Sequence, residues 1–344
     1  MAPELLAAAA ITLGLVVGLA PPRVARGQLL VWGLAGLAAM VAMAVAPNLD
    51  LILLAILILA VLQAGLVARR SFALRLRAPV LAVGLLALGL ALERAQGPVI
   101  LERLGAVGLV AGLVAAVGLL PYIHEFDPDE PVVSSPIPWM AFVGPLLAVA
   151  VLALARAVVP AEAGDAFGAM LIGLGLLNTV WGNVASWRTK SDASAWRYSF
   201  MADWGLALCG LGMAITDGLA AALIILVSIV IGRFPLYLWS RQALREKTTT
   251  DRPINLIVAA ALAGSAPFAG FPARVLLFRG ATQIYWPLGL VLALAMLLWL
   301  PSSLRLGRSL GVPRGRQAIG VAIVLAINVF IGLYPQPLLA LAGL

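Results

Sequence analysis

Few side chains that could carry chemistry lie within the long apolar stretches of this sequence. Asp203, Asp217 and Arg274 are charged residues inside such stretches or at their ends, and Gln63 is an uncharged polar one. An ionisable group inside a bilayer is costly, so each one that is kept is a candidate for a functional role. The chemistry that these residue types could support is the movement of protons or other ions.

Each candidate also has an ordinary structural explanation. Asp203 could be a carboxylate hydrogen-bonded to a tryptophan or to the backbone near a membrane surface. Asp217 could cap the start of a helix, where the helix dipole favours a negative charge. Arg274 could extend its guanidinium to the membrane interface. The sequence leaves both explanations open for each residue.

One connecting segment, residues 121–131, is acidic and rich in proline, so a continuous helix is not expected there. It contains His124, the only histidine, which cannot form a metal site alone. Beside Glu125 and Asp127 it could relay protons, or it could be an ordinary histidine in an interfacial loop. The single cysteine, Cys209, excludes an internal disulfide and a cysteine-ligated cluster, and no cofactor is expected in this chain.

The composition defines the elements that must position these residues. The 344 residues are 63% hydrophobic and 11% charged, whereas a soluble domain has about 25% charged residues. The sequence therefore predicts an all-α polytopic membrane protein whose surroundings are lipid. A net charge of +8 could indicate nucleic acid, but the arginines lie in short loops between apolar runs. Membrane topology explains them better, and no nucleic-acid partner is expected.

About twelve apolar segments have the length of a transmembrane helix. Asp217 marks the break between the eighth and the ninth. The predicted spans are 3–20, 28–46, 49–68, 78–93, 104–121, 137–159, 166–186, 198–216, 217–239, 254–272, 283–304 and 317–341.

Most of the 23 basic residues fall in the loops on one side of this predicted topology. The positive-inside rule makes that side cytoplasmic and places both termini outside the cell. We expect a multi-pass protein of a bacterial or archaeal inner membrane. No loop is long enough to hold a soluble nucleotide or redox domain, so partner subunits would have to supply any redox cofactor.

Three segments carry a recognisable pattern. Residues 119–136 (LLPYIHEFDPDEPVVSSP), 192–205 (DASAWRYSFMADWG) and 264–274 (GSAPFAGFPAR) occur in this order. They resemble three motifs of the antiporter-like membrane subunits found in respiratory complex I, multisubunit cation/proton antiporters and membrane-bound hydrogenases. The resemblance implies one integral membrane domain over 1–344, an antiporter-like bundle with broken helices. Its parts would be variable N-terminal helices to about residue 104, a core over 105–310 and a last helix over 317–341.

The departures from the family pattern concern proton transfer. Positions where the family has buried lysines are occupied here by Ala116, by Leu146 and by Ala193 or Ser194. The position of a glutamate in an early helix of the family falls near Gln63 in this chain. Arg274 alone keeps a charge at its family position, but arginine is a poor proton carrier because its guanidinium stays protonated. The resemblance thus implies the scaffold, whereas the residues argue against ordinary proton pumping.

These observations favour a membrane-arm subunit of a proton- or cation-translocating oxidoreductase, degenerate in pumping and largely structural. Its partners would be other membrane and redox subunits and the lipid bilayer. Any residual ion path would use Asp203, Asp217 and His124. One alternative is a stand-alone secondary transporter, and another is a membrane enzyme acting on lipid-linked substrates through residues 124–130.

Overall fold

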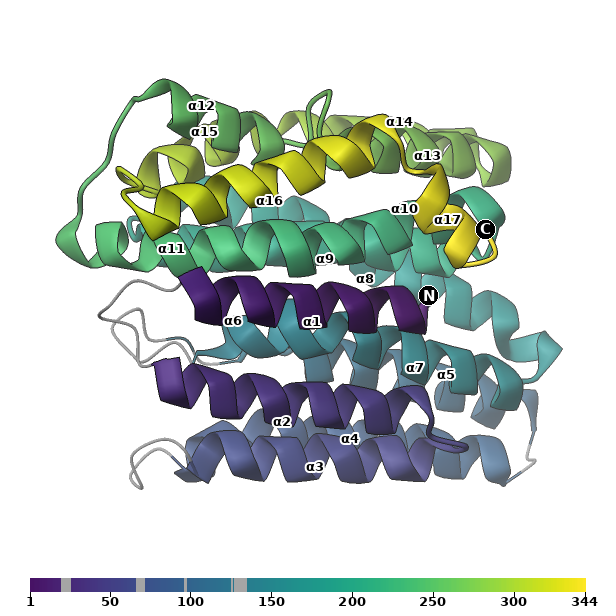
Figure 1. Cartoon of the computed structure of the whole chain (residues 1–344). Coiled ribbons are helices and arrows are strands. Elements are labelled where there is room, and N and C mark those ends of the chain that lie inside the picture. The colour runs from purple at the N-terminus through teal and green to yellow at the C-terminus, as the bar shows by residue number, and fades with distance from the viewer. Residues whose placement is uncertain (20–25, 66–71, 96–97, 125, 127–134) are drawn as a thin grey trace. The chain divides into compact units, whose positions relative to one another are not determined.

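The computed structural model describes residues 1–19, 26–65, 72–95, 98–124, 126 and 135–344 (Figure 1). Every regular element in these ranges is a helix, and none is a strand. Nine of the described helices are long and apolar enough to cross a membrane. The predicted all-α membrane fold is therefore confirmed, and the chain is a multi-pass membrane protein.

The chain divides into two compact units, one made of residues 27–173 and the other essentially of residues 3–26 and 174–344. The division falls inside helix α8 (Ala161–Arg188). We call them the 27–173 unit and the 174–344 unit and describe each by itself. The sequence-based division into helices up to 104, a core over 105–310 and a last helix over 317–341 stays a prediction.

The 27–173 unit is built from antiparallel apolar helices. In chain order it contains α2 (Arg26–Ala44), α3 (Leu49–Gly65), α4 (Phe72–Arg94), α5 (Val99–Val117), α6 (Pro136–Pro138), a π-helix η3 (Trp139–Val143) and α7 (Gly144–Val158). Helices α4 and α5 pack closely because small residues meet at their contact. A Cβ on Gly108 would lie 3.1 Å from the Cα of Gly89.

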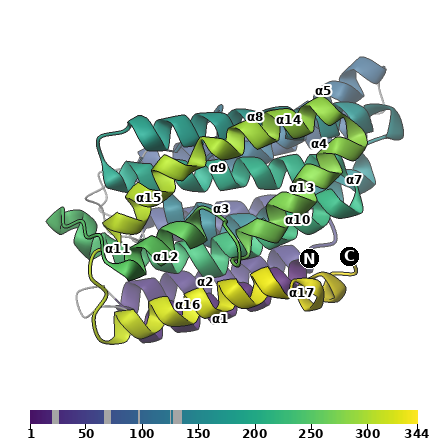
Figure 2. The ribbon, with the colours of Figure 1, turned by 90° about the horizontal axis from the view of Figure 1, so that it is seen from above.

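The 174–344 unit contains the remaining helices. They are α1 (Ala2–Leu19), the second part of α8, α9 (Asp192–Met213), α10 (Thr216–Val227), a π-helix η4 (Ser228–Arg233), α11 (Phe234–Glu246), α12 (Pro253–Leu262), α13 (Gly270–Ile284), α14 (Trp286–Leu297), α15 (Trp299–Ser309), α16 (Arg316–Leu333) and α17 (Gln336–Leu341). Within it α10 packs between α9 and α13, and α12 lies against α15 (Figure 2).

Most of the predicted spans correspond to helix in the structure, with shifted ends, but the spans 254–272, 283–304 and 317–341 are each divided between successive helices. The predicted break at Asp217 is confirmed, because α9 ends at Met213 and α10 begins at Thr216, with Ala214 in the left-handed conformation. The number twelve stays a prediction, because helices such as Leu49–Gly65 and Pro253–Leu262 are apolar but short.

The predicted span 254–272 is interrupted in the structure. Helix α12 ends at Leu262, and α13 begins at Gly270 and continues to Ile284. Gly264 has φ +60°, a conformation that favours glycine, and Pro267 has no N–H to continue a helix. The hydroxyl of Ser265 donates to the carbonyl of Ala260 at 2.9 Å, which satisfies one of the free carbonyls at the end of α12. The broken helices implied by the family resemblance are present.

Both π-helices precede a proline at the start of the next α-helix. Pro145 follows η3 and Pro235 follows η4. A proline cannot donate to the carbonyl one turn earlier, so the chain widens locally. The carbonyl of Val230 in η4 accepts a hydrogen bond from the hydroxyl of Thr12, a residue of α1, at 3.1 Å. This bond satisfies a carbonyl within the widened segment.

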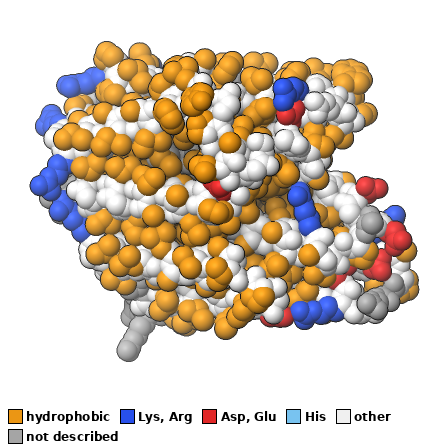
Figure 3. Space-filling view, turned by 45° about the vertical axis from the view of Figure 1, so that its right-hand side comes forward, with side chains coloured by type: hydrophobic (Ala, Val, Ile, Leu, Met, Phe, Trp, Pro, Cys, Tyr) orange, Lys and Arg blue, Asp and Glu red, His pale blue; other side chains and the backbone are white. Residues whose placement is uncertain are grey.

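The surface agrees with a lipid environment. Apolar side chains cover most of the face in Figure 3, and Lys and Arg gather along one edge of that view. In the 174–344 unit, two basic residues near the C-terminal end of α15 are held by ion pairs: Arg308 Nε lies 2.5 Å from Asp251, and Arg305 Nε lies 2.6 Å from Asp192. These two ion pairs thus lie at the end of a helix.

Candidate functional site

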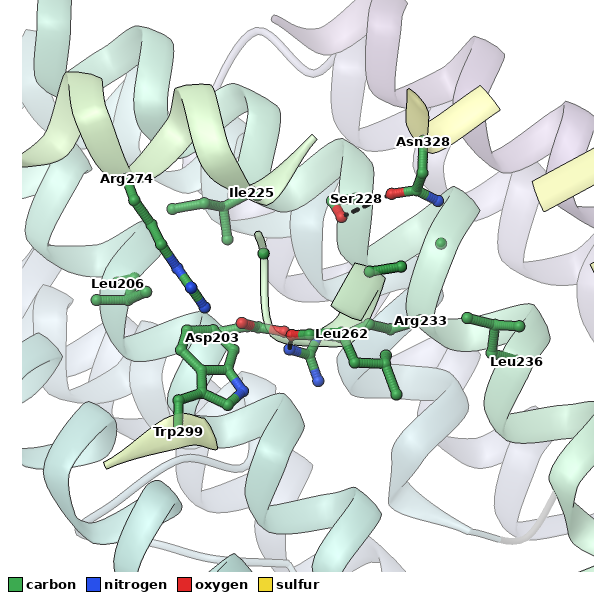
Figure 4. A pocket seen from close by; sticks show the side chains of 14 residues that line it. Asp203, Leu206, Ile225, Ser228, Arg233, Leu236, Leu262, Arg274, Trp299 and Asn328 are labelled. Carbon is green, nitrogen blue, oxygen red and sulfur yellow. Dashed lines mark hydrogen bonds and ion pairs between the residues drawn. The ribbon is translucent and has the colours of Figure 1, made fainter. Parts of the chain in front are cut away.

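A buried ion pair lies at the centre of the candidate site. Asp203 on α9 and Arg233 on η4 pair directly, and each residue is only 5% exposed (Figure 4). Arg233 also donates through Nη1 to the Ser199 hydroxyl at 3.1 Å and through Nη2 to the Leu262 carbonyl at 2.8 Å. The guanidinium therefore connects η4 with α9 and with the end of α12. Such extra hydrogen bonds are what a buried charge pair needs to be tolerated.

The π-helix and its neighbour α16 shape the wall beside this pair. Gly232 precedes Arg233, and a Cβ at that position would lie 2.9 Å from the Asn328 side-chain nitrogen. The Ser228 hydroxyl donates to Asn328 Oδ1 at 3.5 Å, and Asn328 Nδ2 donates to the Val324 carbonyl at 3.0 Å. Glycine therefore allows a polar amide of α16 to approach the backbone of η4.

A second arginine reaches the same place from the helix break. Arg274, the fifth residue of α13, donates through Nη1 to the Ala263 carbonyl beyond the end of α12. Its guanidinium carbon lies 4.0 Å from the centroid of the Trp299 ring, and that of Arg233 lies 5.1 Å from the same ring. Arg274 thus points inward, toward Trp299 and Asp203 (Figure 4), and not along the route to the membrane surface considered from sequence.

These residues line a cavity of about 30 Å³, enough for one or two water molecules. The polar and aromatic residues of its lining are Asp203, Arg233, Arg274, Ser228, Trp299 and Asn328. All belong to the 174–344 unit, and they come from α9, η4, α13, α15 and α16. The cavity therefore brings together two of the predicted site residues, Asp203 and Arg274.

Asp217 lies elsewhere in this unit and does not line the cavity. It accepts two hydrogen bonds from Arg279 of α13, one of them from Nε at 2.5 Å, and a third from Gln283 at 3.4 Å. Its side chain sits in the first turn of α10, as expected for a residue favoured by the helix dipole. Asp217 thus connects α10 to α13.

Two further candidates belong to the 27–173 unit. Gln63 donates to the Ser135 carbonyl at 3.4 Å. His124 Nε2 lies 2.8 Å from the Ala115 carbonyl oxygen, and its ring packs against Gly118, where an added Cβ would lie 2.9 Å away. Asp127, with the adjacent part of the acidic segment, lies outside the described residues. These contacts give His124 a structural position after the end of α5.

The interior of the 27–173 unit is almost entirely apolar. Ala116 and Leu146, at positions where the family has lysines, are 1% and 0% exposed. Among the described residues of this unit, the only buried polar side chains are those of Glu93 and Ser135. Among the described residues, the buried polar side chains are therefore concentrated in the 174–344 unit.

The sequence analysis missed Arg233, the residue that completes the ion pair. Arg233 lies well inside the predicted span 217–239, so the rule that singled out Asp203 would have found it. Ser228 and Asn328 carry a weaker signal of the same kind, as polar residues within apolar spans. That these residues converge could not be predicted, because it depends on how η4 and α16 pack.

Comparison with known proteins gives one curated relative and several similar structures. No family model matches the chain. NADH-quinone oxidoreductase subunit N of Granulibacter bethesdensis is 30% identical over 202 residues, which cover 54% of this chain and 42% of the relative. The chain thus spans less than half the length of that relative.

Three structures share the fold at low sequence identity. A chain of the Mrp complex from Dietzia sp. DQ12-45-1b has a TM-score of 0.77 and 16% identity, over 98% of this chain and 44% of the other. A chain of an archaeal membrane-bound sulfane sulfur reductase has a TM-score of 0.74 and 17% identity, over 95% and 64%. A chain of respiratory complex I from Thermus thermophilus has a TM-score of 0.70 and 16% identity, over 96% and 81%. The resemblance to antiporter-like membrane subunits is confirmed.

Proposed function

We propose that this chain, an antiporter-like membrane subunit by fold, serves in the membrane arm of a multisubunit ion-translocating complex, where its buried charges stabilise the helices and do not relay protons. The relative and the three similar structures support the assignment to such a complex. By name, they come from an NADH-quinone oxidoreductase, from the Mrp complex, from an archaeal respiratory membrane complex and from respiratory complex I. That the buried charges do not relay protons is inferred from this chain's own residues.

The buried Asp203–Arg233 pair is the observation that carries the proposal. A proton relay needs groups that gain and lose protons in turn. Arginine remains protonated, and Asp203 is held in a direct ion pair with Arg233. The remaining titratable group in the cavity lining is Arg274. The three charges therefore form a fixed arrangement and not a chain of carriers.

The 27–173 unit supports the same proposal. Ala116 and Leu146 are buried and cannot exchange a proton. Its described buried polar groups, Glu93 and Ser135, are too few for a conducting file. The other ion-path candidates, namely Asp217, Arg274, His124, Asp127 and Gln63, remain candidates only for a residual path.

The partners would be other hydrophobic subunits and redox subunits that carry the cofactors. The loops that carry most of the basic residues would face the cytoplasm, and both termini would lie outside. The membrane would be the inner membrane of a bacterial or archaeal cell.

Purification from native membranes tests this proposal. We expect the tagged full-length chain, solubilised in a mild detergent, to be recovered with flavin or iron–sulfur subunits and other antiporter-like subunits identified by mass spectrometry. Recovery as a single chain that moves ions by itself would contradict the assignment.

A secondary transporter is the second candidate, and one observation favours it. The break between α12 and α13 lies beside a polar cavity, as in transporters that bind substrate at broken helices. Reconstitution of the chain alone in liposomes separates the two functions. Ion or solute uptake that is lost in an Asp203→Asn variant would favour the transporter.

A further inference from the structure

We propose that the cavity beside Arg274 binds a small monovalent inorganic anion, such as chloride. This inference goes beyond the proposed function and does not depend on it. It rests on the charges of the cavity lining, on the hydrogen-bond donors that the lining offers and on the size of the space.

The charges of the lining do not balance. Asp203 contributes one negative charge and pairs with Arg233. Arg274 contributes a second positive charge, and no carboxylate pairs with it among the described residues. The neutral carbonyl of Ala263 and the Trp299 ring are its contacts. A buried charge without a counter-charge is costly, and a bound anion would supply one.

The second argument concerns hydrogen-bond donors. Trp299 is 3% exposed and lines the cavity, yet its indole N–H has no acceptor among the described residues. An indole N–H can only donate. The lining thus combines an unpartnered donor with an excess positive charge. Gly270, the first residue of the fifteen-residue helix α13, also lines the cavity, so the positive end of that helix lies beside it.

The size of the space decides between anions. A cavity of about 30 Å³ accepts one or two species of the size of water. Chloride or bromide fits that description, whereas sulfate or phosphate, with four oxygens around a central atom, does not. The walls contain apolar groups such as Leu206 and Ile225 (Figure 4), which strengthen the attraction between Arg274 and an anion.

The test uses the full-length chain in detergent or nanodiscs. Two readouts are the line width of the chloride NMR signal and the midpoint of thermal unfolding, in chloride and in gluconate at equal ionic strength. We expect saturable broadening that bromide competes away and sulfate does not, with a higher midpoint in chloride. No saturable broadening, or equal effects of sulfate and chloride, would overturn the proposal.

Two variants and one control locate the site. Arg274→Met should weaken chloride binding by about ten-fold or more, because it removes a charged hydrogen bond. Arg279→Met removes another arginine of α13 that does not line the cavity, and it should bind chloride as the wild type does. Equal binding by Arg274→Met and wild type would refute the site.

Trp299→Phe keeps the charges and removes only the N–H donor. It should weaken chloride binding by about three- to ten-fold. This variant decides the matter if Arg274→Met does not fold, since Phe retains the aromatic face under both arginines. Unchanged affinity in a folded Trp299→Phe chain would then refute the site.

Discussion

At the scale of single residues, the site is defined by how each buried charge is compensated. Arg233 is satisfied by Asp203, Ser199 and Leu262, whereas Arg274 has a backbone carbonyl and an aromatic ring. The sequence predicted Asp203 and Arg274, because a charge within an apolar stretch is conspicuous. It could not predict that Arg233 neutralises one of them, because the pairing depends on packing between distant segments.

The first prediction concerns the Asp203–Arg233 pair. Asp203→Asn leaves the Arg233 guanidinium buried without its counter-charge, so we expect a loss of about 3–5 kcal/mol of stability. Thermal unfolding of the solubilised chain and the amount of folded protein in the membrane measure it. Asp251→Asn, which breaks the exposed pair with Arg308, is the control and should cost about 1 kcal/mol or less.

A double variant tests whether the effect comes from the pair itself. Replacing Arg233 together with Asp203, as in Asp203→Asn with Arg233→Met, removes both buried charges. The double variant should be clearly more stable than the sum of the two single effects implies, which is the signature of direct coupling. Additive losses would mean that the two side chains stabilise the fold independently.

At the scale of elements, the site depends on irregular helices. Arg233 ends the π-helix η4, and Arg274 is the fifth residue of α13, the helix that follows the break. The sequence predicted broken helices through the family resemblance, and Gly264 and Pro267 give the break a local cause. It did not predict the π-helices, because a one-residue widening leaves no trace in an apolar pattern.

The second prediction concerns the helix break. Gly264 has φ +60°, and a Cβ there would lie 2.8 Å from the Arg274 guanidinium carbon. Gly264→Ala should therefore destabilise the chain by about 1–2 kcal/mol from backbone strain alone, with a further loss from displacing Arg274. Thermal unfolding measures it. Gly14→Ala, in open space within α1, should be neutral or stabilising. Equal midpoints for the two variants would show that the break tolerates a side chain.

The third prediction concerns the packing of α8 on α9. A Cβ on Gly205 would lie 2.4 Å from the carbonyl oxygen of Gly175, so the two backbones would have to separate. Gly205→Ala should cost about 1–3 kcal/mol and disturb the position of Asp203, half a turn earlier on α9. Gly173→Ala, with nothing within 4 Å of its added Cβ, is the matched control on α8. A wild-type unfolding midpoint for Gly205→Ala would contradict the packing.

At the scale of the whole molecule, composition alone established a helical membrane protein, because lipid is the only solvent that such an apolar chain tolerates. The three motifs pointed to the antiporter-like fold, which the comparisons confirm. Hydropathy could not show that buried polar residues concentrate in the 174–344 unit while Ala116 and Leu146 lie in an apolar interior. The account that results is a retained scaffold with fixed charges.

The number of protons moved per electron by the assembled complex tests this account most directly. The complex would be purified with wild-type chain or with Asp203→Asn, and the ratio normalised to the amount of this chain in each preparation. We predict that Asp203→Asn lowers the amount of assembled complex and leaves the ratio per complex unchanged. A normal amount of complex with a reduced proton ratio would contradict the account, because Asp203 would then be carrying protons.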